Sequence, residues 1–223
     1  MRTPSRCAGH QTSDFLAHHA SSRARDISLK HMPGVILLSL VLLQAIAAQS
    51  PFGSYEVLLS PRTLPDTCAA EDRDQFRNRT YTFGSRGGSS VTLHNGKAVE
   101  LNPLGTPEWE TSLVSVEPVK LGTREATLLV IGSLHVHGTG EFTHVLVVEC
   151  RNRQLTVWFE AGGEGIRASS LDAAAQELSI ERWIWSPSDA HCCPSKEGQE
   201  RYRWRLGAGG FERIGTSERA APK

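Results

Sequence analysis

Short runs of alternating apolar and polar residues, separated by turn-forming residues, occupy most of the chain after residue 80. The clearest local signal is Asn95-Gly96, which lies between such runs at 91–94 and 97–101. Because Asn and Gly tolerate the positive φ angles of a two-residue type I′ turn, we predict a β-hairpin there. Strands repeated at a spacing of roughly 8–12 residues predict a mainly β fold: an antiparallel sheet, a sandwich or a partly open barrel, with at most one or two short helices.

Two later runs have the composition of central strands. Residues 126–131 and 142–150 are almost continuously apolar, as expected of strands that are covered on both faces. The glycine-rich segment 162–165 predicts a loop. Residues 166–175 include three successive alanines and form the one stretch that a helix could occupy.

A nine-residue apolar run at 35–43 has the form of the core of a secretory signal peptide. Basic residues precede it, and the small residues Ala45-Ile-Ala47 follow it. A membrane-spanning helix needs about 20 apolar residues, so this run is too short for a permanent anchor. We predict cleavage near Ala47, export to the periplasm or the medium, and no stable membrane span after cleavage. Translation starts at Met1 or at Met32.

Composition divides the chain into four predicted parts. Residues 1–47 are the leader and signal peptide, and residues 48–80, which are interrupted by prolines and then highly charged, form an amino-terminal arm or loop segment. Residues 81–215 form the antiparallel β domain. The small, polar residues 216–223 form a flexible tail.

The charge balance argues against nucleic acid as a partner. The formal net charge of the chain is zero, from 24 Lys and Arg against 24 Asp and Glu. The leader holds more bases than acids, so the rest of the chain is slightly acidic. Binding to phosphate groups needs a concentrated positive field, which this composition does not provide.

Four cysteines follow the leader: Cys68, Cys150, Cys192 and Cys193. In an exported chain they indicate up to two disulfides, with three possible pairings. A bridge between Cys192 and Cys193 would strain the peptide between them and is uncommon. We therefore predict that Cys150 pairs with one member of the adjacent pair and Cys68 with the other. The choice between the two members stays open.

Short motifs in the second half of the chain carry a family resemblance. They are Val148-Glu-Cys150, Gly162-Gly-Glu-Gly165, Cys192-Cys-Pro194, Tyr202-Arg-Trp204 and a Gly-Gly-Phe211 turn. Over about residues 115–214 their order resembles a group of bacterial exported proteins of unknown function related to LppP/LprE-type lipoproteins. The resemblance implies an envelope protein and supplies no activity. Such proteins often carry an acidic Gly-Asp-Gly-containing turn, whereas this chain reads Leu121-Gly-Thr-Arg-Glu125, which argues against a calcium loop.

Three histidines are the best metal candidates. His135 and His137 are two residues apart, so on a strand they face the same side, and His144 follows across a glycine turn. Three imidazoles suit zinc. The alternative interpretation is a polar strand face without a ligand, because no acidic fourth ligand accompanies them.

Two tryptophans suggest a ligand groove. Residues 176–185 alternate, with Leu178 and Ile180 on one face and Trp183 and Trp185 on the other. A flat aromatic strip suits a carbohydrate or a peptide, and core packing is the alternative interpretation.

The leading functional hypothesis is an exported, disulfide-stapled, non-catalytic envelope protein that binds another protein or a small ligand. The sequence has no Gly-x-Ser-x-Gly elbow and no His-Glu-x-x-His helix. A zinc-dependent hydrolase that uses the three histidines is the alternative, and zinc is the one cofactor that the residues suggest.

Overall fold

The structure is a computed structural model that describes residues 55–69, 72–83, 89–138, 140–190, 192–207 and 209–222. These residues belong to one of two compact units of the chain, Gln49–Lys223. The predicted leader and signal peptide at 1–47 lie outside the described residues. Within the described part of the chain, no helix is long and apolar enough to span a membrane.

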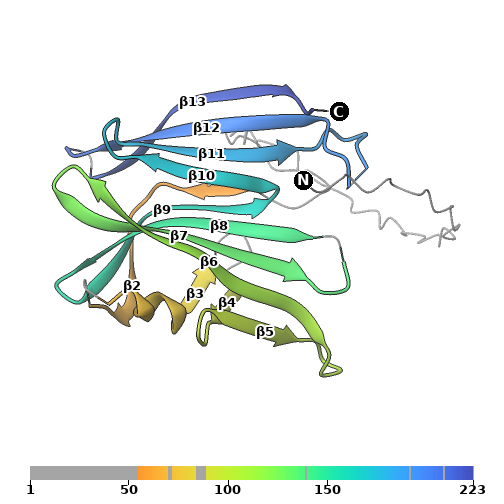
Figure 1. Ribbon diagram of the computed structural model, residues 1–223, viewed down its shortest axis with the longest axis horizontal. Helices are drawn as coiled ribbons and strands as arrows, with labels where there is room; N and C mark the ends of the chain where they lie inside the picture. The colour runs from red at the N-terminus through yellow and green to blue at the C-terminus, as the bar shows by residue number, and fades with distance from the viewer. Residues whose placement is uncertain are drawn as a thin grey trace, which may run out of the picture. The chain divides into compact units, whose positions relative to one another are not determined.

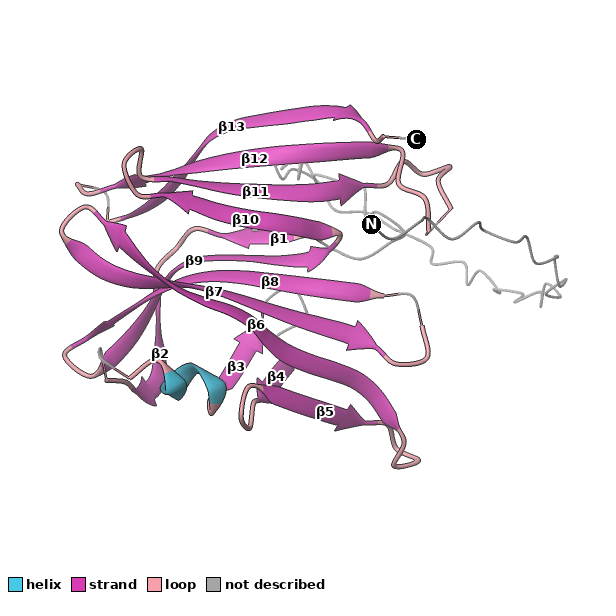
Figure 2. Ribbon diagram, viewed as in Figure 1, coloured by secondary structure: helices cyan, strands magenta, loops and turns pink. Residues whose placement is uncertain are grey.

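Antiparallel strands and one short 3₁₀ helix make up the described chain (Figures 1 and 2). The elements are β1 (Glu56–Leu58), β2 (Arg62–Thr67), η1 (Asp74–Arg77), β3 (Thr80–Phe83), β4 (Ser89–Thr92), β5 (Lys97–Leu101), β6 (Pro107–Leu121), β7 (Arg124–His135), β8 (Glu141–Arg151), β9 (Gln154–Glu164), β10 (Ile166–Asp172), β11 (Glu177–Ile184), β12 (Lys196–Arg205) and β13 (Gly210–Ala220). The predicted mainly β, antiparallel fold is confirmed.

The strands form three sheets. The main sheet runs in the order β1-β9-β8-β7-β6-β5, and β2 also pairs with β9. The second sheet runs in the order β10-β11-β12-β13, and β3 pairs with β4 in a third, two-stranded sheet. In Figure 1 the second sheet lies above the strands of the main sheet, whereas β3 and β4 lie below β7 and β8, near β5.

Both faces of the main sheet are covered, because neighbouring residues on a strand point to opposite faces. On β7, Leu128 belongs to an apolar cluster shared with the second sheet, which contributes Tyr202. The next residue, Leu129, belongs to a cluster on the opposite face, to which Phe76 of η1 and Phe83 of β3 contribute. Burying one such leucine contributes about 1.5–3 kcal/mol, so each covering layer is held by the sheet that it covers.

The turn at Asn95-Gly96 forms as predicted, with positive φ angles of 53° and 81°. His94 and Lys97 exchange backbone hydrogen bonds across it. The predicted hairpin is wrong, because β4 pairs with β3 and β5 pairs with β6. The strands separate directly after the turn: the Gly96 carbonyl accepts a hydrogen bond from the Leu113 N–H, which brings β5 alongside β6.

Residues 166–175 do not form the predicted helix. They form β10 and the turn after it, because Ile166 packs into the cluster under the second sheet and β10 pairs along β11. The Asp172 carboxylate accepts hydrogen bonds from the N–H groups of Ala174 and Ala175, at 2.8 and 3.0 Å, and so organises the turn. Strand pairing outweighs the weak helix preference of three alanines.

Several elements extend beyond their predicted bounds. Strand β9 continues through most of the glycine-rich segment predicted as a loop. Strand β13 continues to Ala220, within the segment 216–223 that the sequence predicts to be a flexible tail, because it pairs with β12 as far as Lys196. Strands β1 and β2 both pair with β9, so parts of the predicted arm at 48–80 belong to the main sheet.

All three tyrosines of the chain lie within the two clusters or beside them. Burial, together with the charge of Glu200, raises the pKa of Tyr55 to about 12. Burial also raises the pKa of Tyr81, whose hydroxyl donates to the Phe76 carbonyl at 2.8 Å. The pKa of Tyr202 is raised by burial and by the hydrogen bond that its hydroxyl donates to Glu200.

The raised pKa values predict an alkaline loss of stability. In the unfolded chain tyrosine ionises near its ordinary pKa of 10.0, whereas in the folded protein all three ionise at higher pH. The stabilising contribution is complete below pH 10 and falls as the pH rises from 10 towards 12 and beyond. Ultraviolet titration should show no tyrosinate near pH 10 while the protein stays folded, and the urea midpoint should fall above that pH. A tyrosinate signal that titrates near pH 10 in folded protein would contradict the burial of the three rings.

Candidate functional site

A disulfide joins Cys68 to Cys150, with 5.8 Å between the two Cα atoms and a sequence separation of 82. The predicted pairing of Cys150 with Cys192 or Cys193 is therefore wrong. Cys150 packs against the cluster on the face of the main sheet that β3, β4 and η1 cover. Cys192 and Cys193 lie in the loop after β11, in the second sheet, which covers the other face. The direction of the Cys150 side chain thus decides its partner.

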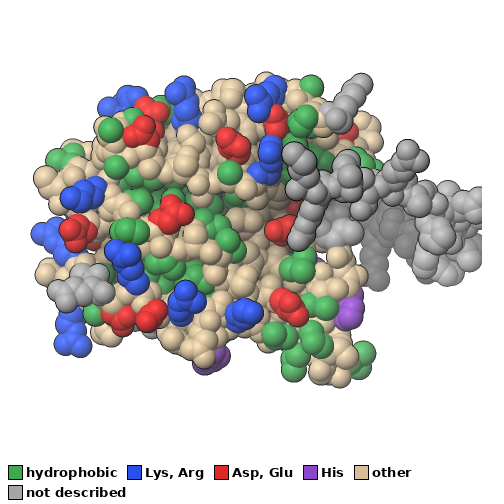
Figure 3. All heavy atoms as spheres, in the orientation of Figure 1, with side chains coloured by type: hydrophobic (Ala, Val, Ile, Leu, Met, Phe, Trp, Pro, Cys, Tyr) green, Lys and Arg blue, Asp and Glu red, His purple; other side chains and the backbone are tan. Residues whose placement is uncertain are grey.

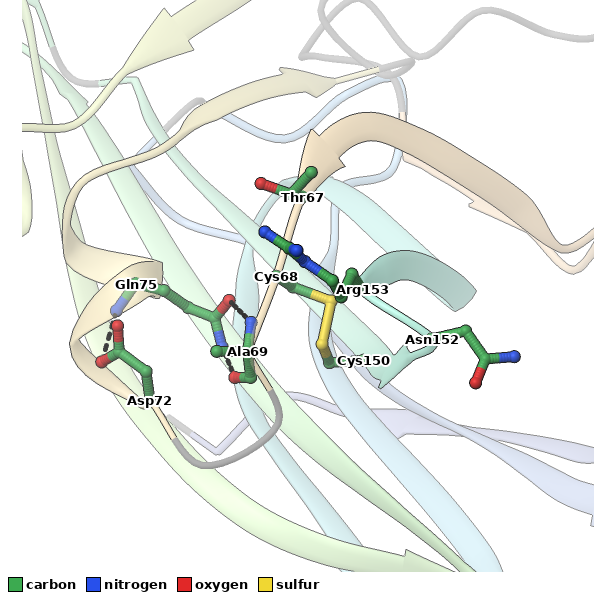
Figure 4. Close-up of a pocket in the computed structure, with 8 residues that line it drawn as sticks. All are labelled: Thr67, Cys68, Ala69, Asp72, Gln75, Cys150, Asn152 and Arg153. Carbon is green, nitrogen blue, oxygen red and sulfur yellow. Dashed lines mark hydrogen bonds between the residues drawn. A yellow bond between two sulfur atoms is a disulfide. The ribbon is translucent and has the colours of Figure 1, made fainter.

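A hollow of about 480 Å³ lies beside this disulfide (Figure 4). Its polar side chains are used to hold the chain after Cys68. The Gln75 amide both donates to the Ala69 carbonyl and accepts from the Ala69 N–H. The Asp72 carboxylate accepts the N–H of Gln75 at 3.2 Å, at the start of η1. These groups satisfy one another, so the hollow belongs to the staple and does not offer a converging set of ligand-binding groups.

Four buried glutamates are each paired with an arginine, and carboxylates are the usual acids and bases of hydrolases. The pairs are Arg62–Glu160, Arg124–Glu149, Arg167–Glu197 and Arg182–Glu200. Each glutamate side chain is at most 9% exposed. Removing one partner from a buried pair leaves an uncompensated charge, so these pairs are part of the structural framework.

The three candidate histidines lie in three different environments. His135 ends β7 and packs edge-on against Trp109, with 4.9 Å between ring centroids. His144 is fully buried and stacks on Phe83 at 3.7 Å, opposite a position four residues before His135, about 13 Å along the strand. His137 is exposed in the turn after β7. Across the described ranges, no group of three or more His, Cys, Asp or Glu is placed to hold a metal, so the predicted three-imidazole site is not assembled there.

The two candidate tryptophans have separate contacts. The Arg167 guanidinium lies 4.1 Å from the ring centroid of Trp183, on the outer face of the second sheet. Trp185 packs against Gly165, where an added Cβ would lie 2.6 Å from the indole ring. Gly165 also has a φ of +82°, so the bend between β9 and β10 requires glycine on both counts. Both rings are half-buried in packing contacts and do not form an open strip.

The described chain carries an apolar surface that sequence patterns did not indicate. We define the exposed apolar face as five side chains, each at least 48% exposed: Val99, Leu101, Leu104, Val114 and Leu134. In Figure 3 apolar side chains gather at the lower right, where Figure 1 draws the end of the β5–β6 pair.

The strand register and one close contact place Val99, Val114 and Leu134 on one face of the main sheet. Leu134 and Leu128 are six residues apart on β7, so they point to the same face, yet Leu128 is 1% exposed and Leu134 is 48% exposed. The difference is the second sheet, which packs over Leu128. Val99 lies opposite Glu110, which lies opposite Leu134, so all three share this face. Val114 lies over Gly132, where an added Cβ would be 3.4 Å from its methyl group.

Acidic side chains flank the exposed apolar face. Glu110 lies between Val99 and Leu134 in one cross-strand row, and Glu141 lies opposite Leu134 on the other side. Both carboxylates are exposed. Lys97, at the start of β5, is an exposed cation on the same face.

Comparison of the chain with protein-family models, with curated proteins and with solved structures found no match. The resemblance to LppP/LprE-type exported proteins therefore stays a prediction from short motifs.

The disulfide between Cys68 and Cys150 should contribute measurably to stability. Replacing both partners, Cys68→Ser with Cys150→Ser, should lower the free energy of unfolding by about 2–5 kcal/mol, because the bridge restricts a long loop in the unfolded chain. Urea unfolding of the purified protein measures the change. The matched control is Cys192→Ser with Cys193→Ser in the exposed loop, which should change stability by no more than about 0.5 kcal/mol. The opposite order of effects would contradict the observed pairing.

Proposed function

We propose that this chain is an exported, disulfide-stapled, non-catalytic envelope protein that binds another protein through the exposed apolar face. One observation carries the proposal. A single face of the main sheet is buried under the second sheet along part of β7 and is open to solvent further along the same strand.

The size of the exposed side chains supports a binding role. Single apolar residues are common on protein surfaces, but contiguous apolar patches are characteristic of interaction sites. Each Leu or Val gains about 1.5–3 kcal/mol when it is fully buried. Burial of the exposed parts of five such side chains would contribute to the free energy of docking, against the cost of association.

The flanking charges indicate the chemistry of the partner. Glu110 and Glu141 lie within the apolar surface, so a favourable partner presents Lys or Arg beside apolar side chains. The same two carboxylates disfavour an anionic membrane surface. Strand β5 ends the path of the main sheet, and a polypeptide segment can extend such an edge by backbone hydrogen bonding.

Export is the part of the proposal that rests on the sequence. The apolar run at 35–43 and the Ala45-Ile-Ala47 site support it, and a disulfide in the domain is compatible with an oxidising compartment. The intact mass of protein recovered from the envelope or the medium should correspond to an amino terminus within a few residues of Ala48. Protein that retains residues 1–47 would contradict cleavage.

Site-specific photocross-linking tests the binding surface. A photoreactive amino acid at position 134, in cells of the native source, should give a discrete protein adduct. Position 206, in the β12–β13 turn, is the control site for the photoreactive residue. Leu206 is 64% exposed and Val114 on the proposed face is 65% exposed, so Leu206→Lys is the matched control for Val114→Lys. Val114→Lys should abolish the adduct at 134, and Leu206→Lys should leave it unchanged. Neither change should alter the unfolding midpoint by more than the equivalent of about 0.5 kcal/mol.

The cross-linked segment of the partner should contain apolar residues next to Lys or Arg. Three results would overturn the proposal: adducts of equal yield at both positions, an adduct that survives Val114→Lys, or cross-linking to lipid alone. A cross-link only between two copies of this chain would replace the proposed partner with self-association.

A further inference from the structure

The loop between β11 and β12 is a closed structure with a fixed base. The Asp189 carboxylate accepts hydrogen bonds from the Ser186 N–H at 2.6 Å and from the Ser195 N–H at 2.9 Å, so it bridges the two ends of the loop. The hydroxyl groups of Ser186 and Ser195 also lie 2.8 Å apart. Hydrogen bonding from Ser186, and then from Ser195, lowers the pKa of Asp189, because both contacts stabilise the ionised form of this bridging carboxylate.

Cys192 and Cys193 lie near the tip of this loop. Both are exposed, and their Sγ atoms are 2.6 Å apart. The Cys193 N–H donates to the Ala190 carbonyl at 2.9 Å, which folds the chain back at the pair. A disulfide bond measures about 2.05 Å, so the two sulfur atoms need to move by only about half an ångström to bond. Cys68 and Cys150 are bonded to each other, and they cover the opposite face of the main sheet.

We propose that Cys192 and Cys193 form a reversible vicinal disulfide, which is made and broken by exchange with an external disulfide or dithiol. This site is independent of the proposed binding function, because it uses none of the residues of the exposed apolar face.

The chemistry of exchange balances without a metal or a cofactor. One cysteine thiolate attacks a sulfur of the external disulfide, the S–S bond of that molecule breaks, and a mixed disulfide forms with release of one thiol. The neighbouring thiolate then attacks the mixed disulfide at the cysteine sulfur. The intramolecular S–S bond forms and a second thiol leaves. Two electrons pass from the cysteine pair to the external disulfide, and the two protons of the cysteines are carried away on its two thiols.

The position of the pair suits reversible exchange. Attack on sulfur requires access from solvent, which both exposed side chains allow. Bridging adjacent cysteines strains the intervening peptide, and strained or exposed disulfides are the more easily reduced ones. The bridge at the base, through Asp189, involves neither cysteine, so forming the S–S bond does not require it to break.

Mass spectrometry with glutathione as the probe tests the proposal. The protein with its disulfides intact is equilibrated with oxidised glutathione, remaining thiols are blocked, and the chain is digested with trypsin. The peptide 183–196 contains both cysteines and no others. It should appear lighter by two hydrogen atoms than its dithiol form, with no label and no glutathione. Treatment with reduced dithiothreitol should restore two reactive thiols, while 63–73 stays linked to 125–151 under mild conditions.

Single substitutions separate exchange from simple proximity. In Cys193→Ser the reaction should stop at a glutathione adduct on Cys192, and in Cys192→Ser at an adduct on Cys193, because the resolving thiol is missing. Asp189→Ala loosens the base of the loop and should raise the fraction of mixed disulfide at least several-fold relative to the wild-type chain. The proposal is overturned if the wild-type peptide carries two glutathiones, keeps two reactive thiols in excess oxidised glutathione, or is linked to a different peptide of the chain.

Discussion

Burial of both faces of β7, β8 and β9 is the constraint on which the rest of the structure depends. On β8, Val145 and Val147 pack under the second sheet, while Leu146 and Val148 pack under the layer that contains β3, β4 and η1. A strand with apolar side chains on both faces is stable only when two layers cover it. The carboxyl-terminal part of the chain supplies one layer, and the segment from η1 to β4 supplies the other.

The two layers are held in different ways. The second sheet has four strands and an apolar inner face, so it is fixed by hydrogen bonding and burial together. The opposite layer contains short strands and a polar stretch after Cys68, with Phe76 as the buried side chain of η1. The disulfide from Cys68 to Cys150 ties the chain just before this layer to the main sheet. The bridge stabilises the fold mainly by restricting the unfolded chain.

Local sequence signals predicted where the strands lie better than they predicted which strands pair. The apolar runs at 126–131 and 142–150 became β7 and β8, and Leu178 and Ile180 are buried as their alternation predicts. Asn95-Gly96 specified its turn, but strand pairing is a long-range property, so the turn did not determine which strands pair. The disulfide was missed for the same reason: spacing along the chain does not show to which face of a sheet a cysteine points. Three alanines favour a helix only when β11, the strand that pairs with β10, is left out of account.

Residue patterns do not predict the exposed apolar face, because they do not show how far the covering layer extends. Apolar residues that alternate along a strand predict a buried face. This prediction holds only where the covering layer extends over those residues. Here β6 and β7 have 15 and 12 residues, whereas the four strands of the second sheet have 7, 8, 10 and 11. At about 3.3 Å per residue, the second sheet ends before the strands beneath it do.

The alternation of side chains cannot stop where the cover stops, so Leu134 continues the row begun by Leu128 and meets solvent. Glu110 and Glu141 lie on either side of Leu134, on the neighbouring strands. Their like charges oppose the stacking of two such faces against each other, and they leave the surface open to a partner of opposite charge. The length of the strands creates this surface, and its two carboxylates restrict what can bind to it.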